Sequence, residues 1–293
     1  MHSRKCGPRH HDTENIAMRV RTVFISDIHL GFKGCSAELL LEFLHQLETD
    51  RLFLIGDIID VWSMHKTMFW PQSHNNVLRT LLGKAKRGTQ IIYVPGNHDE
   101  VFREYSGAVL GNLEIHNEYI HTTLTGQRML VMHGDEFDSV VKCSPWLAKF
   151  GSHVYDVLLA CNPYINWILK RFNRPYWSLS AYLKNKAKTA VQYIGSFEDC
   201  VTQEARRRGV DAVVCGHIHH AEMRLLNGIL YCNDGDWVES CTALVEDANG
   251  RLRLINWGQL RNNVQSAMAL VTAGSIQSEL IDMEVPRETS VEE

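Results

Sequence analysis

The stretch VRTVFISDIHLG occupies positions 20–31 and decides the fold of this chain. Its first seven residues are rich in apolar and β-branched side chains, which predicts a strand over 20–26. Asp27 and His29 follow at the carboxyl end, where the period-2 geometry of a strand points both side chains to one face. One such pair alone is more typical of a turn or a surface than of a metal site.

Four later apolar runs end in the same way, with a carboxylate, amide or histidine after the expected strand. The runs are LFLIG (52–56), IIYVP (91–95), MLVM (129–132) and AVVC (212–215), followed by Asp57, by Asn97, His98 and Asp99, by His133, and by His217 and His219. Taken singly, Asp57 could cap a helix and the Asn-His-Asp stretch could form a turn. Chance would not repeat the pattern at five strand ends, so the sequence predicts one shared metal site.

Between the strands lie stretches with helical spacing, which gives an α/β rhythm. Residues 36–48 predict a helix with Ser36 as its cap, and residues 197–209 predict a second helix that stops at Gly209. Further strands are expected at 229–232, in the 240s and at 252–256. We therefore expect an α/β domain over 19–258, with a disordered N-terminal tail at 1–18 and a peripheral C-terminal tail at 259–293.

Residues 138–200 interrupt this rhythm and predict an inserted helical cap. Between 142 and 188 the chain carries eight basic residues against one acid, together with many aromatic side chains. Such a surface suits an amphiphile, whose acyl chains would contact the apolar groups while Lys and Arg hold phosphates or face an anionic membrane. An ordinary helical hairpin with a solvated basic face is the alternative.

The composition excludes several classes of protein. A formal net charge of −4 does not suggest a chain that coats nucleic acid, and no apolar run is long enough to span a bilayer. The eight cysteines form no C-x-x-C pair, and the first residues lack the apolar stretch of a secretory signal. We expect a cytoplasmic protein.

In this order, the motifs D-x-H, GD, GNHD, HG and GHxH resemble those of the calcineurin-like metallophosphoesterase family, and they cover about 23–220. The resemblance implies an α-β-β-α sandwich of two sheets and a pair of divalent ions, with Mn²⁺ the first expectation and Fe or Zn²⁺ the alternatives. One ion would be held by Asp27, His29, Asp57 and His219, and the other by Asp57, Asn97, His133 and His217.

The resemblance also implies hydrolysis of a phosphoester by water. His98 would stabilise a phosphoryl oxygen or protonate the leaving group, and Asp99 would orient His98. A non-catalytic scaffold is a further hypothesis, but the ligand set is intact, which argues against it.

The ligand spacing and the cap resemble the UDP-2,3-diacylglucosamine pyrophosphatase group of lipid A biosynthesis. This implies a lipid-linked diphosphate substrate, release of UMP and a place on the inner face of the cytoplasmic membrane, with Asn185 and Lys188 as substrate contacts. One position departs from the pattern, because Arg follows the ligand Asn in the best-described branch and His98 does so here. A soluble-substrate phosphodiesterase or phosphomonoesterase, acting on a nucleotide or phosphoprotein, is the alternative. Nucleic acid is not an expected partner.

Overall fold

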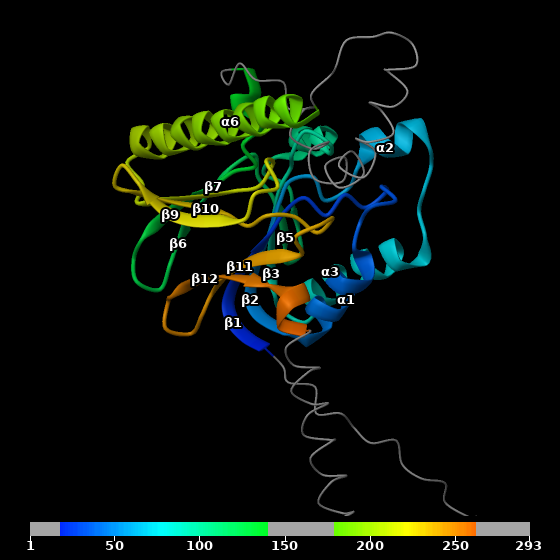
Figure 1. Cartoon of the computed structure of the whole chain (residues 1–293). Helices are drawn as coiled ribbons and strands as arrows, with labels where there is room; N and C mark the ends of the chain where they lie inside the picture. The colour runs from blue at the N-terminus through cyan, green and yellow to red at the C-terminus, as the bar shows by residue number, and fades with distance from the viewer. Residues whose placement is uncertain (1–17, 140–178, 262–293) are drawn as a thin grey trace, which may run out of the picture.

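The computed structural model describes residues 18–139 and 179–261. Two sheets lie face to face between layers of helices (Figure 1). The larger sheet has the order β12-β11-β1-β2-β3-β5-β4. Its strands are β1 (Met18–Ile25), β2 (Leu47–Ile55), β3 (Gln90–Val94), β4 (Val109–Leu110), β5 (Leu113–Ile115), β11 (Thr242–Glu246) and β12 (Leu252–Asn256).

The smaller sheet has the order β6-β7-β8-β10-β9. Its strands are β6 (Tyr119–Thr122), β7 (Arg128–Val131), β8 (Ala212–Cys215), β9 (Glu222–Leu226) and β10 (Ile229–Asn233). Buried side chains from both sheets form the layer between them, with Phe24 stacked on Phe53 at a centroid distance of 4.8 Å and Met129 and Val214 packed in the same cluster. Burial of these apolar groups holds the two sheets together.

Amphipathic helices cover the outer faces. α1 (Ala37–Gln46) and α3 (Gln72–Lys86) pack their apolar stripes on the larger sheet, where Phe43 and Val77 are fully buried. α6 (Leu179–Arg207) lies along the smaller sheet and buries Phe197 and Val201 against it. The predicted α-β-β-α sandwich is confirmed.

Strand direction explains why the site forms at one end of the sandwich. β1, β2, β3 and β5 run parallel in the larger sheet, and β7, β8 and β10 run parallel in the smaller one. The carboxyl ends of parallel strands meet at one edge of a sheet, which is the usual place for a binding site in an α/β protein. The polar residues predicted after these strands are therefore brought together.

The structure changes several of the expected boundaries. The short strands β4, β5, β6 and β9 were not expected, and β2 begins at Leu47 rather than at 52. The helix predicted for 197–209 is the end of α6, which begins inside the predicted cap at Leu179. The described part of the predicted cap, from Leu179 onward, thus belongs to α6, the helix that covers the smaller sheet.

Several predictions fall outside the described residues. These are residues 1–17 of the tail predicted at 1–18, residues 140–178 of the cap predicted at 138–200, and residues 262–293 of the tail predicted at 259–293. Met18, placed in the N-terminal tail by the prediction, is the first residue of β1. Asn185 and Lys188 lie in α6, but their side chains are not among those that the structure describes, so the predicted substrate contacts stay predictions. Among the helices that the structure describes, none is both long enough and apolar enough to cross a membrane.

Candidate metal centre

The backbone at the predicted ligands has an unusual conformation. In residues 18–139 and 179–261, seven non-glycine residues have positive φ, and five of them are predicted ligands: Asp27 at 49°, His29 at 55°, Asp57 at 54°, His217 at 68° and His219 at 53°. The left-handed region costs an L-residue roughly 1–2 kcal/mol. Strain of this kind persists only where the surrounding structure enforces it, and it is concentrated at functional sites.

Backbone hydrogen bonds enforce this geometry by tying the strand-end loops together. The amide of Asp27 donates to Gly56 O at 3.0 Å, and the amide of His29 donates to Asp57 O at 2.8 Å. The amide of His217 then donates to Asp27 Oδ2 at 2.9 Å. Loops from both sheets are therefore fixed relative to one another.

Three glycines allow these loops to approach closely. A Cβ added to Gly96 would lie 2.4 Å from Asp57 Oδ1 and 2.6 Å from His133 Nε2, and one added to Gly56 would lie 2.2 Å from His133 Nδ1. A Cβ at Gly216 would lie 2.4 Å from Asp27 Oδ2. The glycines of the GD, GNHD and GHxH motifs thus leave the space that the ligand side chains occupy.

One cluster of donor atoms is formed by Asp27, His29 and His219. Asp27 Oδ1 lies 2.9 Å from His219 Nε2 and 3.7 Å from His29 Nε2, and the two imidazole nitrogens are 3.4 Å apart. Burial alone raises the pKa of Asp27, but the imidazoles of His219, His29 and His133 together outweigh it and hold that pKa well below its usual range. The carboxylate is therefore ionised and faces two nitrogen donors.

A second cluster joins Asp27, Asp57 and His133. His133 Nδ1 lies 3.0 Å from Ile55 O, to which it can donate, and its Nε2 lies 3.5 Å from Asp57 Oδ1. Burial lowers the pKa of His133, but its contact with Asp57 and the charges of Asp27 and Asp135 together more than offset this and raise it to about 10. The nearby carboxylates thus favour a positive charge at the position of the His133 ring.

The donor atoms fit a divalent cation because several of them have no other partner. Asn97 Oδ1 and His133 Nε2 are buried and make no hydrogen bond to the described residues. Asp27 Oδ1 likewise accepts no hydrogen bond of normal geometry, although His219 Nε2 is near. A buried polar atom left unpaired costs about 1–3 kcal/mol, and a bound cation would remove that cost. Mixed oxygen and nitrogen donors suit Mn²⁺, Fe or Zn²⁺.

His217 is placed differently from the other predicted ligands. Its ring lies beside His133, with centroids 5.2 Å apart, but none of the three donor clusters found among the described residues includes it. Its Nε2 lies 2.8 Å from Asp138 Oδ1 instead. The ring therefore has Nδ1 to offer to a cation.

The expected role of Asp99 is corrected by the hydrogen bonds. His98 Nδ1 lies 2.9 Å from Asp60 Oδ1, and the other oxygen of Asp60 lies 3.1 Å from His29 Nδ1. Asp60 caps α2 (Val61–Lys66) and is buried. It thus orients both His98 and His29, because each of its two oxygens can accept a hydrogen bond from the Nδ1–H of one ring.

Asp99 has another task. Its carboxylate accepts from the Tyr93 hydroxyl at 2.6 Å, from the Gly96 amide at 2.6 Å and from the Ile58 amide at 2.7 Å. Burial raises the pKa of Asp99, and the charge of Asp57 raises it further. Asp99 therefore fixes the backbone of the GD and GNHD loops, whereas His98 Nδ1 is held by Asp60.

Further buried acids support the site and were not predicted. Ser26 Oγ lies 2.7 Å from both Asp27 Oδ2 and Asp234 Oδ1, and Asp236 Oδ1 accepts from the Val238 amide at 2.8 Å. Asp234 and Asp236 follow the strand β10 in the sequence Asn-Asp-Gly-Asp. A sixth strand end with the same pattern was therefore a signal that could have revealed them.

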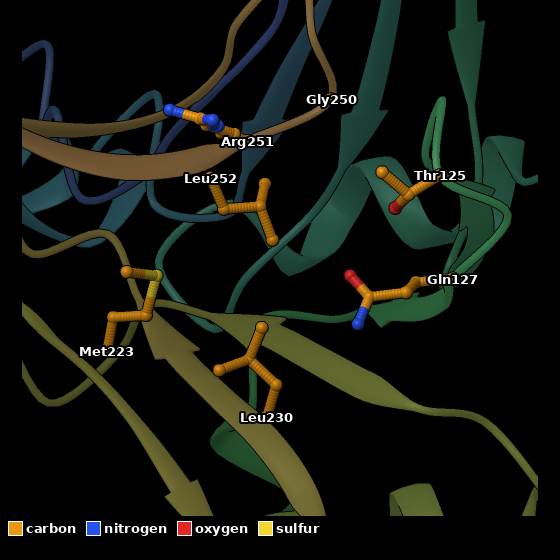
Figure 2. Close-up of a pocket in the computed structure, with 7 residues that line it drawn as sticks. All are labelled: Thr125, Gln127, Met223, Leu230, Gly250, Arg251 and Leu252. Atoms are coloured by element: carbon orange, nitrogen blue, oxygen red, sulfur yellow. The ribbon is translucent and has the colours of Figure 1, made fainter.

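A groove of about 710 Å³ lies elsewhere in the molecule and has no part in this site. Figure 2 shows Met223 and Leu230 on one side of it and Leu252 on the other, with Thr125 and Gln127 at one end. Its lining comes from β9, from β10, from the loop between β6 and β7, and from the start of β12 with the two residues before it. None of the predicted site residues lines it, so the candidate site remains at the strand ends.

The chain belongs to the calcineurin-like phosphoesterase family, whose model matches residues 20–221. It is therefore a metal-dependent phosphoesterase. Among curated proteins it is similar to UDP-2,3-diacylglucosamine hydrolase of Vibrio atlanticus, at 22% identity over 77% of this chain and 93% of that protein. It is also similar to the enzyme of the same name from Stenotrophomonas maltophilia, at 24% identity over 78% of this chain and 96% of that protein.

Solved structures of phosphoesterases match at a lower level. A phosphoesterase from E. coli is 17% identical and gives a TM-score of 0.39, with 80% of this chain and 98% of that chain covered. An archaeal phosphodiesterase is 12% identical, also with a TM-score of 0.39, over 80% of this chain and 98% of that one.

Proposed function

We propose that this phosphoesterase hydrolyses the diphosphate of UDP-2,3-diacylglucosamine, or of a similar lipid-linked nucleotide, and releases UMP. The observation that supports the phosphoester chemistry is that donor atoms from several strand ends gather at one site. Two buried atoms at these strand ends, Asn97 Oδ1 and His133 Nε2, make no hydrogen bond to the described residues. The names of relatives that align over nearly their whole length support the choice of substrate.

Two divalent ions, Mn²⁺ first among them, would be held by the seven residues Asp27, His29, Asp57, Asn97, His133, His217 and His219. When bound, such ions neutralise phosphoryl oxygens and lower the pKa of a water molecule. Asp57 suits the position between the two ions, because its Oδ2 lies 3.8 Å from His29 Nε2 and its Oδ1 lies 3.5 Å from His133 Nε2. Its carboxylate thus faces both groups of donors.

His98 is proposed as the group that protonates the leaving oxygen. Asp60 holds its Nδ1, so its Nε2 is directed to the site, 3.9 Å from Asp57 Oδ2. The ring is partly exposed, and the indole of Trp62 flanks it at a centroid distance of 4.6 Å. As water attacks phosphorus, the bond to the bridging oxygen breaks, and a proton at His98 Nε2 stabilises the departing phosphate.

A place on the inner face of the cytoplasmic membrane is part of the same proposal. A substrate with two acyl chains stays in a bilayer, so the enzyme has to reach a lipid surface. The basic aromatic segment 142–188, proposed to make this contact, falls mostly outside the described residues. Sedimentation with anionic and with neutral vesicles tests the contact, and equal retention by both would rule out an electrostatic contribution.

A second candidate is a phosphodiesterase or phosphomonoesterase for a soluble nucleotide or phosphoprotein. The observation that favours it is His98, which follows Asn97 where the resemblance to the lipid group calls for Arg. A soluble substrate would need no lipid surface and no detergent.

The deciding experiment compares two substrates on the Mn²⁺-loaded protein. UMP release from UDP-2,3-diacylglucosamine in detergent is measured beside the hydrolysis of bis(p-nitrophenyl) phosphate, with His98→Ala as the control in which turnover should be slow. The lipid proposal predicts a higher kcat/KM for the lipid diphosphate. Turnover of the aryl ester alone would overturn it and leave the second candidate.

A further inference from the structure

We propose that Asp138 positions His217 as a metal ligand through Nδ1, and that Tyr193 holds Asp138 in place from α6. This inference rests on the proposed two-ion site and assigns a role to two residues outside the ligand motifs. It starts from a difference between His217 and the other three histidines of the site.

Those three histidines turn Nε2 toward the carboxylates. His29 Nδ1 contacts Asp60, His133 Nδ1 contacts Ile55 O, and His219 places Nε2 at 2.9 Å from Asp27 Oδ1. His217 has the reverse arrangement, because its Nε2 is the atom held by a protein acceptor, 2.8 Å from Asp138 Oδ1. A ligating histidine commonly donates its second ring N–H to a carboxylate, which fixes both its tautomer and its orientation. Asp138 meets that requirement for His217 and leaves Nδ1 for the ion.

Asp138 is itself held from another element. It lies in the 3-10 helix η2 (Asp135–Ser139), and the Tyr193 hydroxyl donates to its Oδ1 at 2.9 Å. Tyr193 is buried and packs in the cluster that contains Phe197 and Met132. Since a buried ring in a close-packed core has little freedom, its hydroxyl is a fixed point for the carboxylate.

The loop before Asp138 is pressed against the same helix. A Cβ added to Gly134 would lie 2.7 Å from Phe197 Cζ, so the chain after His133 passes directly over α6. His133 and His217, which the resemblance assigns to one ion, are therefore both positioned relative to α6. His29 and His219 are positioned by Asp60 and by the loop after β10 instead. The clamp, defined as Asp138 with Tyr193, should affect one ion site and spare the other.

The clamp also joins the two ends of the insertion. Asp138 lies just before residue 140, where the insertion leaves the described fold, and Tyr193 lies in the helix through which the chain returns. A change in the position of α6 would reach the ligand His217 through two hydrogen bonds.

The test measures metal binding rather than activity alone. Mn²⁺ titration of the metal-free protein, followed by electron paramagnetic resonance and calorimetry, gives the affinity of each ion and the coupled signal of an ion pair. Asp138→Asn keeps the shape but replaces the charged acceptor by a neutral amide oxygen, which holds the Nε2–H more weakly and so stabilises the tautomer with Nδ1 unprotonated less. We expect the affinity for one ion to fall about 10–100-fold, the other to change little, and the coupled signal to weaken.

Tyr193→Phe removes only the hydroxyl and should give a smaller loss at the same ion. Tyr105→Phe, at an exposed tyrosine, and Asp199→Asn, at an exposed acid on α6, are the matched controls and should bind both ions as the wild type does. Melting temperatures of the metal-free variants identify any that fail to fold. If Asp138→Asn fails to fold, Tyr193→Phe still tests the clamp.

Two results would overturn the inference: unchanged affinity for both ions in Asp138→Asn, or an equal loss at both. A wild-type protein that binds two ions but does not cleave the lipid diphosphate would contradict the proposed substrate and leave the clamp intact. A wild-type protein that binds a single ion would contradict the proposed two-ion site, and the clamp with it.

Discussion

His98 Nδ1 lies 2.9 Å from Asp60 Oδ1, although Asp99 is its neighbour in the chain. The same Asp60 contacts His29 Nδ1 at 3.1 Å, so one buried carboxylate serves a metal ligand and the proposed proton donor together. Changes at this residue should therefore affect turnover more than folding.

Asp60→Asn should lower kcat by about 10²–10⁴-fold, since it weakens the orientation of the group that donates the proton. Asp99→Asn should act differently, because Asp99 holds backbone amides of two loops, and its main effect should be a lower melting temperature. Steady-state kinetics and thermal unfolding of both variants separate the two roles. A wild-type kcat in Asp60→Asn would show that the contact with His98 has no part in catalysis.

The roles of His98 and Asp57 are separated by metal content. His98→Ala should keep both ions and slow turnover by about 10²–10⁴-fold, whereas Asp57→Ala should abolish the pair of ions. Elemental analysis after gel filtration measures the ions and an aryl phosphodiester assay measures the rate. Equal metal loss in the two variants would contradict this assignment.

Gly96→Ala should abolish the binding of the ion pair, because the new methyl group would overlap Asp57 Oδ1 and His133 Nε2. Gly195→Ala is the control, since nothing lies within 4 Å of its added Cβ and it sits inside α6. There alanine should raise stability by about 1 kcal/mol through its higher helix propensity. Manganese titration and thermal unfolding of the pair report both effects, and full metal binding by Gly96→Ala would show that the loops can move apart.

Glu246 provides a test of stability against pH. This buried residue of β11 accepts from Thr22 Oγ1 at 2.7 Å, from the Leu124 amide at 2.6 Å and contacts His121 Nε2 at 3.2 Å. Burial alone raises its pKa, but these contacts, led by that to His121, lower it to about 2. A lowered pKa means that the ionised group stabilises the fold above its ordinary pKa of 4.5, and that this stability is lost as the pH falls from 4.5 toward 2.

Glu246→Gln should therefore lose on the order of 1–3 kcal/mol of unfolding free energy at pH 7 and flatten the pH dependence in that acid range. Chemical denaturation from pH 7 to pH 2 measures both quantities. Glu114→Gln, at a partly exposed acid paired with His116, is the control and should change stability little. If the unfolding free energies of Glu246→Gln and wild type changed in parallel with pH, Glu246 would be excluded as the source of the loss of stability in acid.

The strands with long apolar runs could be predicted from the sequence, because burial on both faces requires them to be apolar throughout. β9 was missed, since its residues Met223, Arg224 and Leu225 lie exposed on the edge of a sheet and show no strand pattern. β4 and β5 contain two and three residues, which is too short for any period to emerge.

The ligand candidates could be predicted because each follows an apolar run directly. Their supporting residues could not be placed in the same way. Asp60 and Asp138 contact His98 and His217 across gaps of 38 and 79 positions, which only the packing of the loops closes. Proximity in sequence instead favoured Asp99 as the partner of His98. The carboxylate of Asp99 in fact accepts hydrogen bonds from backbone amides of its own loop and of the GD loop.

The left-handed backbone at five predicted ligands has a consequence for the protein outside catalysis. That conformation is unfavourable whether or not ions are present, so the metal-free chain is less stable than its two sheets alone would make it. Ions that bind the folded chain and not the unfolded one raise its stability by about 2.7 kcal/mol at a concentration 100 times the dissociation constant. The amount of folded protein should therefore follow the supply of free metal, and metal starvation should shorten its lifetime before it limits its rate.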